Sequence, residues 1–287
     1  MSSCDSCPSK ASCTSQASCP SANGEHKEPE ITFEKLNDKS SIKKVIGVCS
    51  GKGGVGKSFV TSVLAARLAR DGYSVGVLDA DVTGPSIPKA FGLKGNLTAD
   101  QDKLIIPAVS HSGIKVVSLN LLMENEEAPV VWRGPVIGGL VKQFWTDVNW
   151  GTLDVLLIDM PPGTGDVPLT VFQSIPVDGI ILVSTAQDLV SMIVNKARNM
   201  ALMMNVKILG FVENMSYVKC PDCDKLISLF GKQGSVKKAA DEVGVPLFDT
   251  IPLNPSNTDL VDDGHIEKIP SGVLDGTVKG IEELIGI

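Results

Sequence analysis

The stretch that decides the fold is Gly51-Lys52-Gly53-Gly54-Val55-Gly56-Lys57-Ser58. It fits the phosphate-loop pattern G-x-x-x-x-G-K-[ST] at every fixed position. A short apolar run, Val45–Cys49, precedes it, and apolar residues recur at helical spacing over Phe59–Arg70. Glycines let backbone N–H groups turn toward phosphate oxygens, and the start of a helix adds a favourable dipole. The stretch therefore predicts a phosphate-binding loop between a strand and a helix.

Further short apolar runs follow the loop, with helix-compatible sequence between them, at Val75–Leu78, Val155–Ile158, Gly179–Val183 and Ile208–Val212. Short apolar strands that alternate with helices predict an α/β fold, a doubly wound and mainly parallel sheet with helices on both faces. Residues 1–40 have almost no large apolar side chain before Ile31, which predicts a flexible arm. Residues 41–287 are expected to form the nucleotide-binding domain.

The residues of the loop and the acids after the strands predict ATP and Mg²⁺ as ligands. Lys57 is expected to neutralise the β- and γ-phosphates, while Ser58 and Asp159 are expected to hold Mg²⁺. Asp79 and Asp81 follow the strand at Val75–Leu78 and point to the same edge of the sheet, so one of them could orient or deprotonate the attacking water. An acid at a strand end can also serve only as a turn or helix cap.

Net charge, hydropathy and cysteine content indicate which classes of partner and which cellular compartment the sequence favours. The net charge of −7 argues against nucleic acid, because a phosphate backbone requires a basic face. No apolar run approaches the roughly 18–20 residues of a membrane span, and the closing segment, Gly276–Ile287, lacks the cations of a membrane-surface helix. Residues 1–20 do not resemble a secretory signal. An odd count of seven cysteines without an export signal favours a cytoplasmic protein with metal or redox chemistry over a disulfide framework.

One C-x-x-C pair, Cys220 and Cys223, follows the last of the predicted strands. Its spacing lets both thiolates reach one metal, which leaves half of a four-coordinate site to another donor. A second copy of the chain would complete either a [4Fe–4S] site or a Zn(Cys)₄ site. A redox dithiol and two unligated cysteines are the other interpretations. Cys49 ends an apolar run and is interpreted as structural.

The extra lysine of the loop, Lys52, resembles the signature of the deviant Walker A class, which includes chromosome-partition ATPases, Min-type septum regulators, nitrogenase iron protein and the Mrp/ApbC cluster carriers. In that class the matching lysine reaches the nucleotide of the partner subunit, which implies a homodimer. Asp81 matches the water-activating acid, and Asn214 matches an asparagine that contacts adenine. Asp159–Asp166, Trp132–Pro135 and Glu213–Ser216 resemble motifs of the Mrp branch in particular. The resemblance covers residues 41–287.

The resemblance implies an ATP-dependent carrier that binds a [4Fe–4S] cluster between subunits at Cys220 and Cys223 and passes it to apo-proteins, with slow ATP hydrolysis as the switch. The alternative is a spatial regulator like the partition and septum ATPases. It would require a basic DNA-binding face or an amphipathic membrane helix, and it leaves the cysteine pair without a purpose. A reductase like nitrogenase iron protein fits less well, because its cluster ligands are far apart in sequence.

The arm carries four further cysteines, Cys4, Cys7, Cys13 and Cys19, with the spacing C-x2-C-x5-C-x5-C. The first three partly match a set in eukaryotic-type scaffold relatives, which place their fourth cysteine upstream of the pair. Here the fourth lies downstream, so the arm is interpreted either as a second metal or cluster site or as a thiol-rich tail.

Overall fold

The computed structural model describes residues 33–81, 86–122, 134–186, 198–199, 201–230 and 234–286. The strands are β1 (Ser41–Ser50), β2 (Val75–Asp79), β3 (Thr98–Ala99), β4 (Ile105–Ile106), β5 (Ala108–Val109), β6 (Lys115–Ser118), β7 (Thr152–Asp159), β8 (Gly179–Ser184), β9 (Ile208–Glu213), β10 (Tyr217–Lys219), β11 (Leu226–Ser228) and β12 (Leu247–Thr250). The helices are α1 (Lys57–Arg70), α2 (Ile87–Ala90), η4 (Leu119–Leu122), α3 (Gly134–Thr146), α4 (Asp166–Ser174), α6 (Ser235–Val243), α7 (Pro255–Asp262), η5 (Ile266–Lys268) and α8 (Asp275–Ile285).

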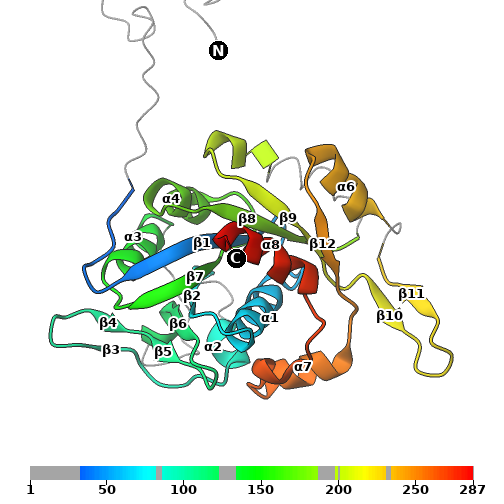
Figure 1. Ribbon diagram of the computed structural model, residues 1–287, viewed down its shortest axis with the longest axis horizontal. Coiled ribbons are helices and arrows are strands. Elements are labelled where there is room, and N and C mark those ends of the chain that lie inside the picture. Colours follow the sequence, from blue (N-terminus) through cyan, green and yellow to red (C-terminus); the bar gives the residue numbers. More distant parts are fainter. Residues whose placement is uncertain are drawn as a thin grey trace, which may run out of the picture. The chain divides into compact units, whose positions relative to one another are not determined.

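An eight-stranded sheet in the order β12-β9-β8-β1-β7-β2-β6-β5 forms the centre of the domain (Figure 1). Every neighbouring pair runs parallel except β5 with β6. β1 lies between β7 and β8, so the loop that follows it emerges from the middle of the sheet. The predicted α/β fold, a mainly parallel sheet covered by helices, is confirmed. Such sheets bind ligands at the carboxyl ends of their strands.

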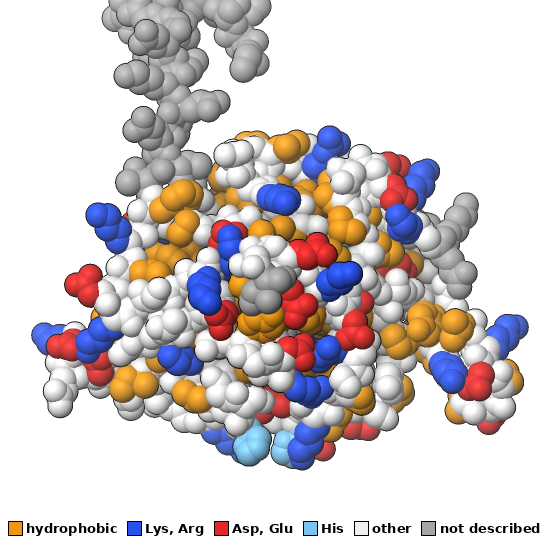
Figure 2. Space-filling model, viewed as in Figure 1, with side chains coloured by type: hydrophobic (Ala, Val, Ile, Leu, Met, Phe, Trp, Pro, Cys, Tyr) orange, Lys and Arg blue, Asp and Glu red, His pale blue; other side chains and the backbone are white. Residues whose placement is uncertain are grey.

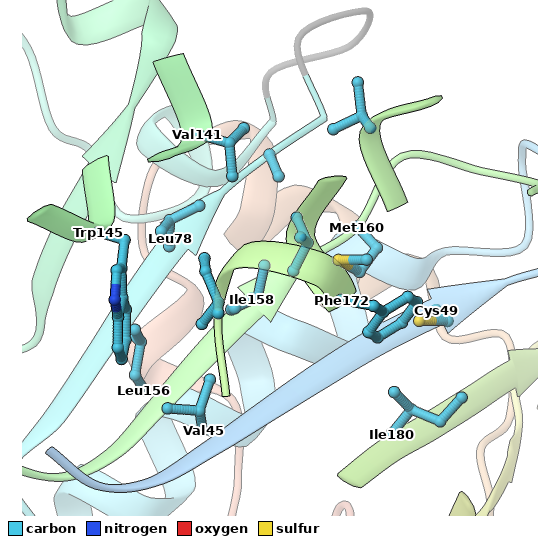
Figure 3. Close-up of a cluster of buried hydrophobic side chains, with 14 of the residues drawn as sticks. Val45, Cys49, Leu78, Val141, Trp145, Leu156, Ile158, Met160, Phe172 and Ile180 are labelled. Atoms are coloured by element: carbon cyan, nitrogen blue, oxygen red, sulfur yellow. The ribbon is translucent and has the colours of Figure 1, made fainter. Parts of the chain in front are cut away.

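Alternate residues of β1 explain why both faces of the sheet are buried. Val45 and Cys49 join a core with the apolar sides of α3, α4 and α6, part of which is drawn in Figure 3. Ile46 and Val48 point the other way and pack with α1, α2 and α8. A strand with apolar residues on both faces is typical of a parallel sheet between two helical layers.

Residues 33–40 pack against this domain, although the sequence places them in the arm. The Glu34 N–H donates to the Ser174 carbonyl at 2.8 Å, and the Trp145 indole N–H donates to the Glu34 carbonyl at 2.9 Å. The Asn37 amide donates to two further backbone carbonyls at 2.9 and 2.8 Å. The compact unit therefore begins at Phe33, and the part of the predicted arm that lies outside the described residues is 1–32.

Two features of the last third of the chain complete the domain. β10 and β11 form an antiparallel hairpin that projects beside the sheet (Figure 1). α8 buries Val278 and Ile281 against the domain. In the part of the chain that the structure describes, no helix is both long and apolar enough to cross a membrane.

Candidate nucleotide and cysteine sites

The phosphate loop runs from β1 to α1 around a cavity of about 420 Å³. Gly54 and Gly56 both have φ of +78°, a backbone conformation that favours glycine. The cavity is lined by Ser50, all the loop residues from Lys52 to Ser58, Phe59, Asp81, Ser86, Ala90, Pro162 and Val261. The structure thus brings together at one cavity the loop residues from Lys52 to Ser58 and the acid Asp81. The start of α1 at Lys57 adds the backbone N–H groups that suit an anion.

Asp159 is the fully buried centre of the hydrogen-bond network beneath the loop. Its Oδ2 accepts from the Ser58 hydroxyl at 2.6 Å and from the Lys57 ammonium at 2.7 Å. Lys57 is only 5% exposed and also pairs with Asp81 at 3.4 Å. The two carboxylates balance the charge of this buried lysine, which would otherwise be costly to bury. Removing one partner of a buried ion pair typically costs roughly 3–5 kcal/mol.

The chemistry of these side chains suits magnesium. Mg²⁺ prefers oxygen ligands in an octahedral arrangement and usually binds through one or two carboxylates, a hydroxyl and nucleotide phosphates. Ser58 supplies the hydroxyl and Asp81 a carboxylate at the cavity, and the buried Asp159 carboxylate accepts from the Ser58 hydroxyl. The donor set therefore fits the magnesium ion that the sequence predicts.

Asp79 and Asp81 occupy different positions. The strand-end pattern alone leaves both as candidates for the acid at the attacking water, whereas the family resemblance matches Asp81. Asp79 is buried at the end of β2, where its carboxylate accepts from the Asp81 N–H at 3.1 Å and from the Ser118 hydroxyl at 2.9 Å. Burial, and then the negative charge of Asp159, raise the pKa of Asp79 well above its usual range. Asp81 instead lines the cavity. The geometry favours Asp81 over Asp79 as the acid that faces a water molecule, and it gives Asp79 the role of holding the Asp81 backbone.

Asn214 lies immediately beneath the phosphate loop. It follows β9, is 3% exposed, and donates from Nδ2 to the Val55 carbonyl at 2.9 Å. It also lines a second cavity of about 180 Å³ with Phe59, Met215, Pro252, Leu253, Asn254, Asn257, Thr258 and Val261. Phe59 and Val261 line both cavities, so the second one adjoins the phosphate cavity. The contact of Asn214 with adenine that the resemblance implies stays a prediction.

Sequence reasoning missed one residue of the phosphate site and one side of the second cavity. Thr61 donates to Oδ1 of Asp159 at 2.7 Å and is fully buried. Its position four residues after Lys57 puts both on one side of α1, which was the available signal. The residues that α7 contributes to the second cavity, among them Asn257 and Thr258, carry no recognisable motif in the sequence.

The motifs that resemble the Mrp branch are described in part. The Gly163 N–H of the Asp159–Asp166 motif donates to the Ser50 carbonyl at 2.9 Å, and Pro162 lines the phosphate cavity. Trp132 and Arg133 of the Trp132–Pro135 motif lie outside the described residues.

The Cys220–Cys223 pair lies in the turn between β10 and β11. Cys220 is half-buried and Cys223 is exposed. The backbone N–H groups of Asp222 and then Cys223 donate to the Cys220 sulfur and lower the pKa of its thiol. The Cys220 N–H donates to the Lys225 carbonyl at 2.9 Å. Backbone N–H groups aimed at sulfur stabilise a thiolate, which is the form that binds metal.

Apolar side chains flank this turn without cover from the described part of the chain. Leu226, Ile227 and Leu229 are 53%, 46% and 40% exposed. Figure 2 shows hydrophobic side chains on the hairpin next to the charged residues of its tip. Within the described residues, no group of three or more His, Cys, Asp or Glu side chains could hold a metal ion, so one copy of this part supplies the pair alone.

The remaining cysteines differ from this pair. Cys49 is buried in the core of Figure 3, and burial raises the pKa of its thiol to about 12. That environment agrees with a structural role. Cys4, Cys7, Cys13 and Cys19 lie outside the described residues.

The loop, the buried acids and the parallel sheet together define a P-loop NTPase. A family model described as ParA: NUBPL iron-transfer P-loop NTPase matches residues 41–282. The chain belongs to this family. The match spans both the phosphate loop and the region that carries the cysteine hairpin.

Individual relatives agree with the family match. The chain is 49% identical over 235 residues to an iron-sulfur cluster carrier protein of Clostridium perfringens, covering 79% of this chain and 82% of the relative. It is 41% identical to the cytosolic Fe-S cluster assembly factor CFD1 of Kluyveromyces lactis, covering 80% and 82%. A nucleotide-binding protein of Archaeoglobus fulgidus, solved in complex with ADP, matches with a TM-score of 0.72 and 42% identity over 80% of this chain and 89% of that one.

Proposed function

We propose that this protein is an ATP-dependent carrier that holds a [4Fe–4S] cluster at Cys220 and Cys223 and transfers it to apo-proteins. The observation that carries the proposal is a thiol pair on a hairpin of a P-loop NTPase domain, with Cys223 exposed, Cys220 half-buried and backbone N–H groups donating to Cys220. The names of the C. perfringens and K. lactis relatives support iron–sulfur cargo over zinc. The cytosolic designation of the latter supports the predicted cytoplasmic location.

The protein is proposed to work as a homodimer, because one hairpin offers two thiolates and a [4Fe–4S] cluster takes four. The same hairpin exposes Leu226, Ile227 and Leu229, an apolar surface that a second copy would cover. Lys52 lines the phosphate cavity and is proposed to reach the nucleotide of the partner subunit. Mixing Lys52→Ala with Asp81→Asn protein tests this arrangement. Hydrolysis should return in the mixture, since one site of each mixed dimer keeps both groups; no recovery would refute a lysine acting across the dimer.

ATP hydrolysis at the loop is proposed as the switch. Lys57 neutralises phosphate charge, Asp81 orients the attacking water, and Asn214 contacts the base. Ser58 and Asp159 would hold Mg²⁺, which supplies charge neutralisation on the phosphates when bound. The ADP complex of the A. fulgidus protein supports nucleotide binding at this loop. A slow ATPase is sufficient, because the free energy of nucleotide binding or hydrolysis has only to shift the balance between two dimer geometries.

Anaerobic reconstitution with iron and sulfide tests the cargo. Wild type, Cys220→Ala/Cys223→Ala and the control Cys49→Ala are compared by iron, sulfide and zinc analysis and by absorbance. One [4Fe–4S] per dimer in wild type and Cys49→Ala, lost in the double variant while nucleotide binding persists, would support the proposal.

The other outcomes contradict it in different ways. Iron that survives in the double variant would move the cluster to Cys4–Cys19, and a variant with those four cysteines changed to serine would then lose it. Zinc or no metal in wild type would refute the carrier and favour the spatial-regulator hypothesis.

A further inference from the structure

Thr61 stands one helical turn after Lys57 on α1 and is fully buried. Its hydroxyl lies 2.7 Å from Oδ1 of Asp159 and 3.1 Å from the Lys57 carbonyl. A threonine hydroxyl has a single proton to donate. The carboxylate is the stronger acceptor and the shorter contact, so the proton goes to Asp159.

The two oxygens of Asp159 are therefore held from different sides. Thr61 donates to Oδ1, while Ser58 and Lys57 donate to Oδ2. Oδ2 is the oxygen beside the Ser58 hydroxyl, the group expected at Mg²⁺. Without the Thr61 hydroxyl, the carboxylate could rotate about its terminal torsion, which is a soft one. Oδ1 would also lose a donor in a fully buried place.

We propose that Thr61 is a positioning residue of the nucleotide site, which fixes the Asp159 carboxylate so that Oδ2 faces Ser58 and the bound metal. The inference rests on the ATPase function proposed above. Thr61 lies outside the phosphate-loop pattern, and it does not line the cavity, so it acts only through Asp159. Residues that orient a metal-site carboxylate commonly change metal affinity by about 10- to 100-fold when removed.

The neighbouring Ser62 provides a matched control. It is also fully buried on α1, and its hydroxyl has no hydrogen-bond partner among the described residues. Ser62→Ala therefore removes a buried hydroxyl of the same helix without touching Asp159. Thr61→Val removes the hydroxyl at nearly constant volume, and Thr61→Ser restores the donor.

The experiment measures ATP affinity by fluorescence titration, in excess EDTA and across a Mg²⁺ series, for wild type and the three variants. The Thr61→Val protein should bind ATP in EDTA as wild type does, but its gain in affinity from Mg²⁺ should fall about 10- to 100-fold. Thr61→Ser and Ser62→Ala should keep the gain. Thr61→Ala replaces the valine variant in the same titration if the latter does not fold.

Two other results separate the possible failures. An unchanged Mg²⁺ gain in Thr61→Val, even with a lower melting temperature, would show that Thr61 is only structural and would overturn the inference. A wild-type protein that binds no ATP, or gains nothing from Mg²⁺, would instead refute the proposed ATPase function.

Discussion

Adding one methyl group at Gly56 should disturb the nucleotide site through Asn214. A Cβ at Gly56 would lie 2.2 Å from Asn214 Nδ2, far inside van der Waals contact. Asn214 would have to move and release its hydrogen bond to the Val55 carbonyl. Gly54 is the matched control, because it has the same φ of +78° and a Cβ there would meet nothing within 4 Å.

The backbone strain of a left-handed alanine is common to both variants and costs about 1–2 kcal/mol. Gly56→Ala adds the loss of the Asn214 hydrogen bond and an unpaired buried polar group, together about 1–3 kcal/mol. We therefore expect Gly54→Ala to lower the free energy of unfolding by about 1–2 kcal/mol. Gly56→Ala should lower it by about 2–5 kcal/mol. For a domain of this size each 1 kcal/mol lowers the melting temperature by about 2–4 °C.

Denaturant unfolding of the nucleotide-free proteins measures this difference. Adding Asn214→Ala to each variant completes a double-mutant cycle. The clash disappears when Asn214 is truncated, so Gly56→Ala should cost less in that background, whereas the cost of Gly54→Ala should stay constant. Equal destabilisation by the two glycine variants, or additivity at Gly56, would refute the placement of Asn214 beneath the loop.

Three further predictions concern Asp79, Cys220 and the backbone hydrogen bonds at the start of the β10–β11 hairpin. The raised pKa of Asp79 means that the folded state holds this proton more tightly than the unfolded state, so wild-type stability falls as pH rises above about 4. Asp79→Asn should remove the part of this fall in unfolding free energy that Asp79 causes. Denaturant unfolding from pH 4 to 8 measures it, and a variant whose stability falls with pH as steeply as that of wild type would contradict this. Because two backbone N–H groups lower the pKa of the Cys220 thiol, iodoacetamide should alkylate it at lower pH in the folded than in the unfolded protein, as peptide mass spectrometry can show. The Ser216 N–H donates to the Ile251 carbonyl, and the Leu253 N–H donates to the Tyr217 carbonyl. ATP should slow hydrogen exchange at these two amides in wild type, but not in Asn214→Ala. Equal slowing in both proteins would show that Asn214 does not connect the cavity to the hairpin.

The centre of the sheet was predictable because its signals are local. Val45–Cys49 lies within β1, and the apolar run ending at Asp159 lies within β7, since strands buried on both faces show as continuous apolar sequence. The short strands β3 to β5 gave no such signal, because they have two residues each and are largely exposed. Their partners lie only a few residues away along the chain, but a two-residue strand is too short to show a periodic pattern.

Only the site residues that belong to recognisable sequence motifs could be predicted. The pattern identifies Lys57 and Ser58, and the family resemblance matches Asp81. The place of Asp79 depends on its contact with Ser118, thirty-nine residues later, which no motif encodes. Thr61 was missed because a threonine inside a helix is usually an ordinary core residue. The residues of α7 line the second cavity only because tertiary packing brings this helix next to Phe59 and Asn214, and the local sequence does not encode that packing.

The segment that follows β9 is a direct backbone connection between the proposed nucleotide site and the thiol pair. The strand ends at Glu213, Asn214 then reaches under the phosphate loop, and β10 begins only three residues later at Tyr217. Met215 between them has a left-handed φ of +53°, which turns the chain sharply. The Ser216 hydroxyl donates to Glu213 at 2.9 Å and its N–H to the Ile251 carbonyl at 3.0 Å, so this connection is held at both ends. A movement of Asn214 that follows phosphate binding at Val55 would therefore reach the hairpin through a short, constrained segment of backbone, without any change in the sheet itself.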